Sequence, residues 1–390
     1  MAQTPLAFDH HPADAQSGFE LGWDHAHHGT VPPPAQLHEG NPVRQGWQAG
    51  KACFGRRTLP ATRHTRKWLQ LRLNAWLRAR SFELLQVTPN YLAQIDVAQC
   101  PITRQPLEHG SGTPADASVD RVFNDAGYAA GNLAVMSVKA NRIKANLGWQ
   151  DALVMVQHAE GSIDGLADGL CAAEWSRLAV LMSFVTPLPH QQAARLPLLL
   201  LPPNRLHLLN PVQGLQALVT RELGQPAWCQ RMRLLADALP GKPVRADFNL
   251  LLNALLPRLI EATRSHNAGT MKLALEDAWT NPLVNRRWQR FALQLDEPQI
   301  EALLQHGAAR SLGGARWALL DRAVATEGWA LQSQGYVSPN HAASMPRARD
   351  AAMVRASGES SHHLKARHRQ LPFVRQQLRS VVEVAPFDHR

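Results

Sequence analysis

The sequence predicts a mainly α-helical protein that carries one small α+β element. From residue 149 onward, apolar residues recur at helical spacing, and Pro or Gly separates most of these segments. Near residue 120, two short strand-like stretches, 118–123 and 133–138, precede a basic helical stretch, 139–147, which Gly148 ends. The expected helices are 150–160, 170–185, 211–222, 228–239, 248–263, 271–280, 285–295, 297–305 and 314–325.

Composition indicates the class of partner. The chain has 390 residues, which is enough for roughly two or three domains, and its hydrophobic content of 45% supports real cores. Lys and Arg number 41 against 31 Asp and Glu, a formal net charge of +10. Such a balance is typical of proteins that bind a polyanion.

Cysteine usage and hydropathy indicate the compartment. The chain has four scattered cysteines, which form neither a disulfide framework nor a zinc pattern. The first 18 residues lack a signal layout, and no apolar run approaches the roughly 20 residues that span a bilayer. We therefore expect a soluble protein of the reducing cytoplasm.

Five segments follow one another along the chain. We expect a flexible arm over 1–40, a basic helical lead-in over 41–98, and a small α+β finger over 99–148. An all-helical domain over 149–333 and a basic, partly disordered tail over 334–390 complete the chain. The His-rich stretches of the arm, 9–11 and 24–28, either bind a transition metal or are a polar tail without ligand geometry.

The lead-in carries the strongest charge bias. No acidic residue occurs from 41 to 82, whereas ten Lys and Arg do. Residues 65–85 have helical spacing, so one face is expected to dock on the body while the other meets phosphate or only solvent. Trp47 and Trp68 either stack on bases or lie in the core. The cations predicted to contact nucleic acid here are Arg56, Arg57, Arg63, Arg66, Lys67 and Arg72.

Three motifs in the finger resemble one known family. They read Ser-x-Asp-Arg over 118–121, Gly-Tyr-x-x-Gly-Asn over 127–132, and Asn-Arg-x-Lys over 141–144. As a set they are similar to the core of the HNH endonucleases, the ββα-metal or His-Me finger superfamily, in its phage and bacterial Asp-Arg branch. The resemblance covers about an eighth of the chain.

The resemblance implies a chemistry and a set of residues. Asp120 and Asn141 would hold one divalent metal, Mg²⁺ or alternatively Mn²⁺, and Asn132 would orient the loop or the catalytic group. The family's activity is metal-dependent hydrolysis of DNA phosphodiesters. A single finger would nick one strand, so cleavage of both strands would need a dimer. RNA is a second candidate substrate, and defence against foreign DNA is the pathway that this motif suggests.

One departure from the family concerns the general base. The His that typically follows the strand acid is replaced by Arg121, which stays protonated and cannot accept a proton from water. Three explanations remain open: His109 in the preceding loop is the base, a metal-bound water attacks unaided, or the site does not cut. Arg121 itself either clamps the scissile phosphate or braces the turn through Asp116 or Asp125.

Other residues of the finger also have two interpretations. Arg142 and Lys144 are expected to contact the substrate backbone, with a solvated helix end as the alternative. Cys100 has no Cys two or three residues away, so packing rather than zinc is expected to hold the finger.

Two further hypotheses stand beside the nuclease. One is a nucleic-acid-binding protein that keeps a degenerate HNH scaffold without cutting. In the other, the helical domain carries the main function by binding a protein partner or forming a homodimer, and the finger is a structural module. A second basic cluster at 286–290 fits either DNA contact or an ordinary helix surface.

Overall fold

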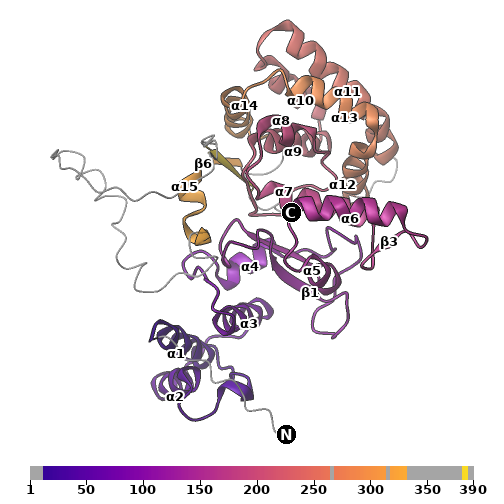
Figure 1. The fold of residues 1–390 in the computed structure, drawn as a ribbon. Helices are drawn as coiled ribbons and strands as arrows, with labels where there is room; N and C mark the ends of the chain where they lie inside the picture. Colours follow the sequence, from indigo (N-terminus) through magenta and orange to yellow (C-terminus); the bar gives the residue numbers. More distant parts are fainter. Residues whose placement is uncertain (1–11, 264–267, 313–316, 332–379, 385–390) are drawn as a thin grey trace, which may run out of the picture.

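The computed structural model describes residues 12–263, 268–312, 317–331 and 380–384. Within these ranges the protein is mainly helical, with fifteen α-helices and three small antiparallel sheets. Figure 1 shows the first helices at one end, the small sheet near residue 120 in the middle, and the later helices at the other end. The predicted mainly helical class is confirmed, and none of the described helices is long and apolar enough to cross a membrane.

The predicted flexible arm contains a helix of 16 residues. α1 (Pro12–His27) packs along α2 (Pro42–Phe54), and a short 3₁₀ turn, η1 (Pro34–Gln36), lies between them. A Cβ added at Gly22 would lie 1.9 Å from the carbonyl oxygen of Val43, so the two backbones nearly touch. Gly22 is therefore a small residue at the crossing of α1 and α2. Residues 1–11 of the predicted arm lie outside the described residues.

The lead-in contains two more helices, α3 (Arg63–Leu77) and α4 (Pro89–Ile95). Thr62 and Thr88 cap their amino ends by accepting hydrogen bonds from backbone amides. α3 ends well before residue 85, the predicted limit, and Ala79 just beyond it has a positive φ of 48°.

The finger has the predicted order of strand, strand and helix. β1 (Ala117–Arg121) pairs antiparallel with β2 (Leu133–Ser137), and α5 (Val138–Lys144) follows directly. Because side chains alternate along a strand, the sheet faces two different cores. Its Val119 face joins the core of α1 to α4, and its Met136 face joins the core of the helical domain.

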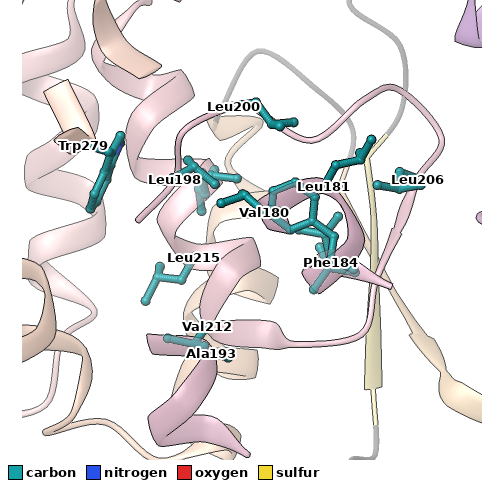
Figure 2. Close-up of a cluster of buried hydrophobic side chains, with 14 of the residues drawn as sticks. Val180, Leu181, Phe184, Ala193, Leu198, Leu200, Leu206, Val212, Leu215 and Trp279 are labelled. Atoms are coloured by element: carbon teal, nitrogen blue, oxygen red, sulfur yellow. The ribbon is translucent and has the colours of Figure 1, made fainter. Parts of the chain in front are cut away.

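The helical domain is built around α9, whose thirteen residues are all buried. Figure 2 shows part of the core beside it, where Val212 and Leu215 of α9 lie among side chains from several other segments. Eight of the nine predicted helices are confirmed. The helices of this domain are α6 (Trp149–Gly161), α7 (Ala172–Phe184), α8 (His190–Arg195), α9 (Pro211–Leu223), α10 (Trp228–Asp237), α11 (Gly241–Thr263), α12 (Ala268–Asp277), α13 (Pro282–Ala292), and α14 (Glu297–Ala309), with a 3₁₀ turn η2 (Ala278–Thr280).

The predicted helix 314–325 is wrong, and the predicted tail, 334–390, is described only at 380–384. The expected helix 314–325 is strand β6 (Trp317–Asp321) followed by the one-turn helix α15 (Arg322–Ala325) and the 3₁₀ turn η4 (Glu327–Trp329). The expected tail contains β7 (Ser380–Val384), the middle strand of the sheet β5-β7-β6. Its neighbours lie far away in the sequence, so local patterns could not reveal the pairing. The remaining strands are β3 (Leu166–Ala167), β4 (Leu170–Cys171) and β5 (His207–Leu208).

Candidate nucleic-acid interface and the ββα site

The predicted metal ligand Asp120 lies in an internal ion pair. Nζ of Lys144 is 3.1 Å from Oδ2 of Asp120, and the two residues are 0% and 6% exposed. The ammonium donates its hydrogen bonds to the backbone oxygen of Arg121 at 3.0 Å and to Oδ1 of Asn124 at 2.8 Å. Attraction between opposite charges joins Oδ2 of Asp120 to Lys144. Lys144 therefore points into the finger and away from any phosphate.

Burial dominates the electrostatics of Asp120. Loss of hydration raises the pKa of its carboxyl, and the attraction of Lys144 acts in the opposite direction with smaller effect. A buried carboxylate without a counter-charge would cost several kcal/mol. Lys144 thus supplies the positive charge that the resemblance assigns to a metal ion.

The second predicted ligand, Asn141, is also engaged inside the finger. Its Nδ2 donates to Oγ of Ser118 at 2.7 Å. Ser118 and Asp120 share one face of β1, while Asn141 and Lys144 share one face of α5. The two pairs therefore form neighbouring links between the strand and the helix.

Asn132 braces the long loop between the two strands. Its side chain is fully buried, and Oδ1 accepts a hydrogen bond from the amide of Phe123 at 2.8 Å. Its Nδ2 donates to the backbone oxygens of Phe123 and Gly127, both at 3.1 Å. Every polar atom of the Asn132 side chain thus serves the loop, which is the kind of contact that an orienting residue makes.

Arg121 contacts the same loop. Its Nη1 donates to the backbone oxygens of Asn124 at 2.8 Å and Ala126 at 2.7 Å. The guanidinium also lies over the ring of Tyr128, 5.3 Å from the ring centre. Of the two interpretations of Arg121, the structure contains the turn brace, with carbonyl oxygens rather than Asp116 or Asp125 as its partners.

Both residues predicted to hold a divalent cation have partners inside the finger, Asp120 with Lys144 and Asn141 with Ser118. Among the described residues, no group of three or more His, Cys, Asp and Glu side chains could hold a metal ion. An ion bound by Asp120 would have to displace Nζ of Lys144 or share the carboxylate with it, at the cost of charge repulsion. His109 is exposed in the loop before β1.

Cys100 ties the segment before β1 to the end of β2. Its Sγ is buried and accepts hydrogen bonds from the amides of Thr103 at 3.5 Å and Ser137 at 3.3 Å. The thiol lies 3.5 Å from Oγ of Ser137 as well. Packing and hydrogen bonds thus join these segments at a cysteine that has no cysteine neighbour.

The predicted nucleic-acid contacts divide into surface and interior residues. Lys144 is buried as described, and Arg72 is buried over the ring of Trp68 and paired with Asp24. These two side chains do not lie on a surface that a phosphate could reach. Lys67 is half-buried, and Arg63 is exposed but paired with Asp96. The exposed cations are Arg56, Arg57, Arg63, Arg66 and Arg142.

The amino end of α5 and the polar face of α3 flank one loop. Lys67 on α3 is electrostatically coupled to Asp116, whose carboxylate accepts the amides of Ser111 and Gly112. The backbone oxygen of Asp116 accepts from Val138, the first residue of α5. The next residue is Lys139, which is exposed and was not among the predicted contacts with nucleic acid. Its position three residues before Arg142 could have indicated it, because residues three apart are neighbours on a helix surface.

The aromatic residues of the lead-in are packed. The indole Nε1 of Trp68 donates to the backbone oxygen of Val87 at 2.7 Å, and that of Trp47 donates to Thr30 at 3.0 Å. Trp68 is buried, and Trp47 is partly covered. Their side chains belong to the fold rather than to a free stacking platform.

The His-rich stretch 24–28 lies in α1 and the turn that follows it. Asp24 is paired with Arg72, and Nδ1 of the buried His25 lies 2.9 Å from Oγ1 of Thr30. Burial, assisted by the charge of Arg72, lowers the pKa of His25 to about 4. These residues pack the helix rather than converge as metal ligands. Of the other His-rich stretch, 9–11, the structure describes nothing.

Comparison with known proteins identifies no relative. No family model, curated protein or solved structure matches this chain. The likeness to the HNH endonucleases therefore rests on the three motifs quoted above, and each residue is interpreted through its contacts.

Proposed function

We propose that this protein binds nucleic acid through a basic surface and uses its ββα finger as a scaffold that does not cut. The observation that carries the proposal is the ion pair between Lys144 and Asp120, because it occupies the carboxylate on which metal-dependent hydrolysis would depend. The basic surface consists of Arg56, Arg57, Arg63, Arg66, Lys139 and Arg142.

Arg121, which stands where the family has its general base, also supports a finger that does not cut. Arg121 is held by two carbonyl oxygens and a tyrosine ring, so it maintains the shape of the loop. A guanidinium cannot accept the proton of an attacking water. The finger therefore has neither a free metal ligand nor a base at the two positions where the family's chemistry needs them.

The charge of the chain supports the polyanion partner. Residues 41–82 contain ten cations and no acid, and of these cations Arg72 is buried against Asp24 and Arg63 is paired with Asp96. Cations on a surface contact phosphates of any sequence and release counterions, so binding weakens steeply as salt rises. We therefore propose duplex DNA contacted mainly through its backbone.

The binding test compares two double variants with equal changes of charge. Arg66→Glu with Arg142→Glu alters the basic surface, whereas Arg233→Glu with Arg245→Glu alters exposed arginines of α10 and α11. Fluorescence anisotropy with a labelled DNA duplex is measured from 50 to 200 mM salt. The first variant is expected to bind at least about tenfold more weakly and to lower the salt slope by about two. Equal losses in both variants would contradict a defined surface.

The cleavage test uses supercoiled plasmid with Mg²⁺ or Mn²⁺. The wild-type protein is expected to leave the plasmid intact at concentrations that bind it. Nicking by the wild type that disappears in both Asp120→Ala and Asn141→Ala would overturn the non-cutting function and establish the metal-dependent nuclease instead.

A further inference from the structure

Strand β7 enters its sheet from a distant part of the sequence. Residues 332–379 separate it from the preceding described residue, yet it lies between β5 and β6 as the middle strand. All five of its residues pair with β6, from Ser380 opposite Asp321 to Val384 opposite Trp317. Two of them also pair with β5. Without β7 the two flanking strands would have no partner in this sheet.

The strand contributes a short anchor of apolar side chains. Val381 and Val382 are both 0% exposed. Gly214 of α9 makes room for Val382, because a Cβ at that glycine would lie 3.0 Å from its Cγ2. At the end of the strand, Glu383 pairs with Arg205 at 2.8 Å. Ladder hydrogen bonds, two buried valines and one ion pair are the elements by which sheets bind extended peptides.

Two clefts that are partly open to solvent border β7. A cavity of about 270 Å³ lies against Val382, between β6 and α14, and is lined also by Leu304 and Trp317. A second cavity of about 240 Å³ lies against Glu383 and includes Tyr91 and His207. Space that is open to solvent therefore borders the site of β7 at two places, which is the access that a competing strand needs.

We infer that the groove between β5 and β6 is a binding site for an extended strand, and that residues 380–384 of this chain occupy it as an exchangeable ligand. The recognised pattern is two consecutive β-branched residues followed by an acid. Val382 packs against Gly214 of α9, Val381 is buried on the opposite face of the strand, and the acid meets Arg205.

The groove is connected to the finger. β5 begins at His207, whose amide donates to the backbone oxygen of Gly131 at 3.0 Å, in the loop between β1 and β2. A Cβ at Gly131 would lie 2.1 Å from Nδ1 of His207, so the imidazole rests directly on this loop. Nδ1 of His207 is also 3.0 Å from the backbone oxygen of Ala325, next to β6. Occupation of the groove thus braces the finger, and its consequence for DNA rests on the proposed function.

The experiment cuts the folded, full-length protein between the finger and β7. A protease recognition sequence is inserted between Gly358 and Glu359, and the purified protein is cleaved. The carboxyl-terminal fragment is expected to co-elute with the body in size-exclusion chromatography. A fluorescent peptide of residues 378–386 in large excess is then expected to replace it, with anisotropy as the readout.

A matched peptide with Val382→Asp controls for specificity, because it keeps the length and the ladder while placing a charge among the buried valines. It should bind at least about tenfold more weakly than the native peptide. Equal binding of the two peptides would overturn the inference. A cleaved body that retains its own fragment against excess peptide for days, or that unfolds when the fragment leaves, would overturn it too.

Two further readouts separate this inference from the proposed function. If uncut protein elutes as a dimer that the peptide converts to monomer, the groove is a strand site that a second copy fills. DNA binding is measured in parallel on the cleaved and exchanged samples. Peptide exchange without any DNA binding would leave the strand site standing and contradict only the proposed function.

Discussion

Lys144 on α5 and Asp120 on β1 form an ion pair at 3.1 Å that is sealed from solvent inside the ββα finger. The pair joins the helix to the strand at the point where the family resemblance implies a metal ion. The site therefore has the charge balance of a structural element rather than that of an open cation site.

The first prediction concerns the replacement Lys144→Met. Methionine keeps most of the unbranched apolar stem but leaves Asp120 buried without a counter-charge, so the free energy of unfolding should fall by about 3–5 kcal/mol. Urea unfolding followed by circular dichroism measures the change. Lys139→Met, at an exposed position of the same helix, should change stability by no more than about 0.5 kcal/mol.

The double variant Asp120→Asn with Lys144→Met provides the internal check. It removes both charges, so its loss should be clearly smaller than that of Lys144→Met alone. Additive losses would show that the two charges do not interact.

The second prediction concerns acid sensitivity at His25. The unfolded imidazole has a pKa near 6.5, whereas burial lowers the folded pKa to about 4. The unfolded state therefore binds the proton first, and stability present above pH 6.5 is lost as the pH falls toward 4. The loss amounts to about 2–3 kcal/mol between pH 7.5 and 4.5.

His25→Asn tests this directly, because Asn does not titrate and its amide stands in for Nδ1 opposite Thr30. Unfolding by urea at pH 7.5 and 4.5 should show a smaller acid-induced loss in the variant than in the wild type, by that same amount. An equal loss in both proteins would mean that other groups account for the acid sensitivity.

The third prediction compares two glycines with similar backbone angles. Gly131 has a φ of +80° and Gly110 a φ of +76°, but only at Gly131 would a Cβ meet an imidazole, 2.1 Å away. Gly110→Ala should cost about 1–2 kcal/mol for the left-handed conformation alone. Gly131→Ala should cost at least about 2 kcal/mol more, since His207 or the loop must shift. Equal costs in thermal unfolding would contradict the tight contact between the finger and β5.

The fourth prediction concerns the missing base. Arg121→His places an imidazole where the family has one, but Asp120 remains paired with Lys144. The variant is therefore expected to leave supercoiled plasmid uncut with Mg²⁺ or Mn²⁺. Nicking by Arg121→His that Asp120→Ala abolishes would show that Asp120 can hold a metal beside Lys144.

Where local patterns dominate, prediction and structure agree closely. The helices of the later domain follow the apolar spacing, apart from α8, which was not predicted, because most of them bury one face along their own length, and α9 buries all of its residues. The finger was found for the same reason, since β1, β2 and α5 are consecutive and their turns are local. The helix α1 was not predicted. Gly22 is unfavourable within a helix, and the reason for a glycine there is the close backbone of α2, which the local sequence does not show.

The sequence by itself determined the helical class, the order of elements in the finger and the excess of positive charge, because these follow from composition and from contacts between near neighbours. Only the tertiary structure decided that Lys144 turns inward to Asp120, that Arg72 is buried against Asp24, and that β7 completes a sheet with β5 and β6. Each of these joins residues that lie well apart in the chain. Which charges end up paired and which remain on the surface depends on how the elements pack.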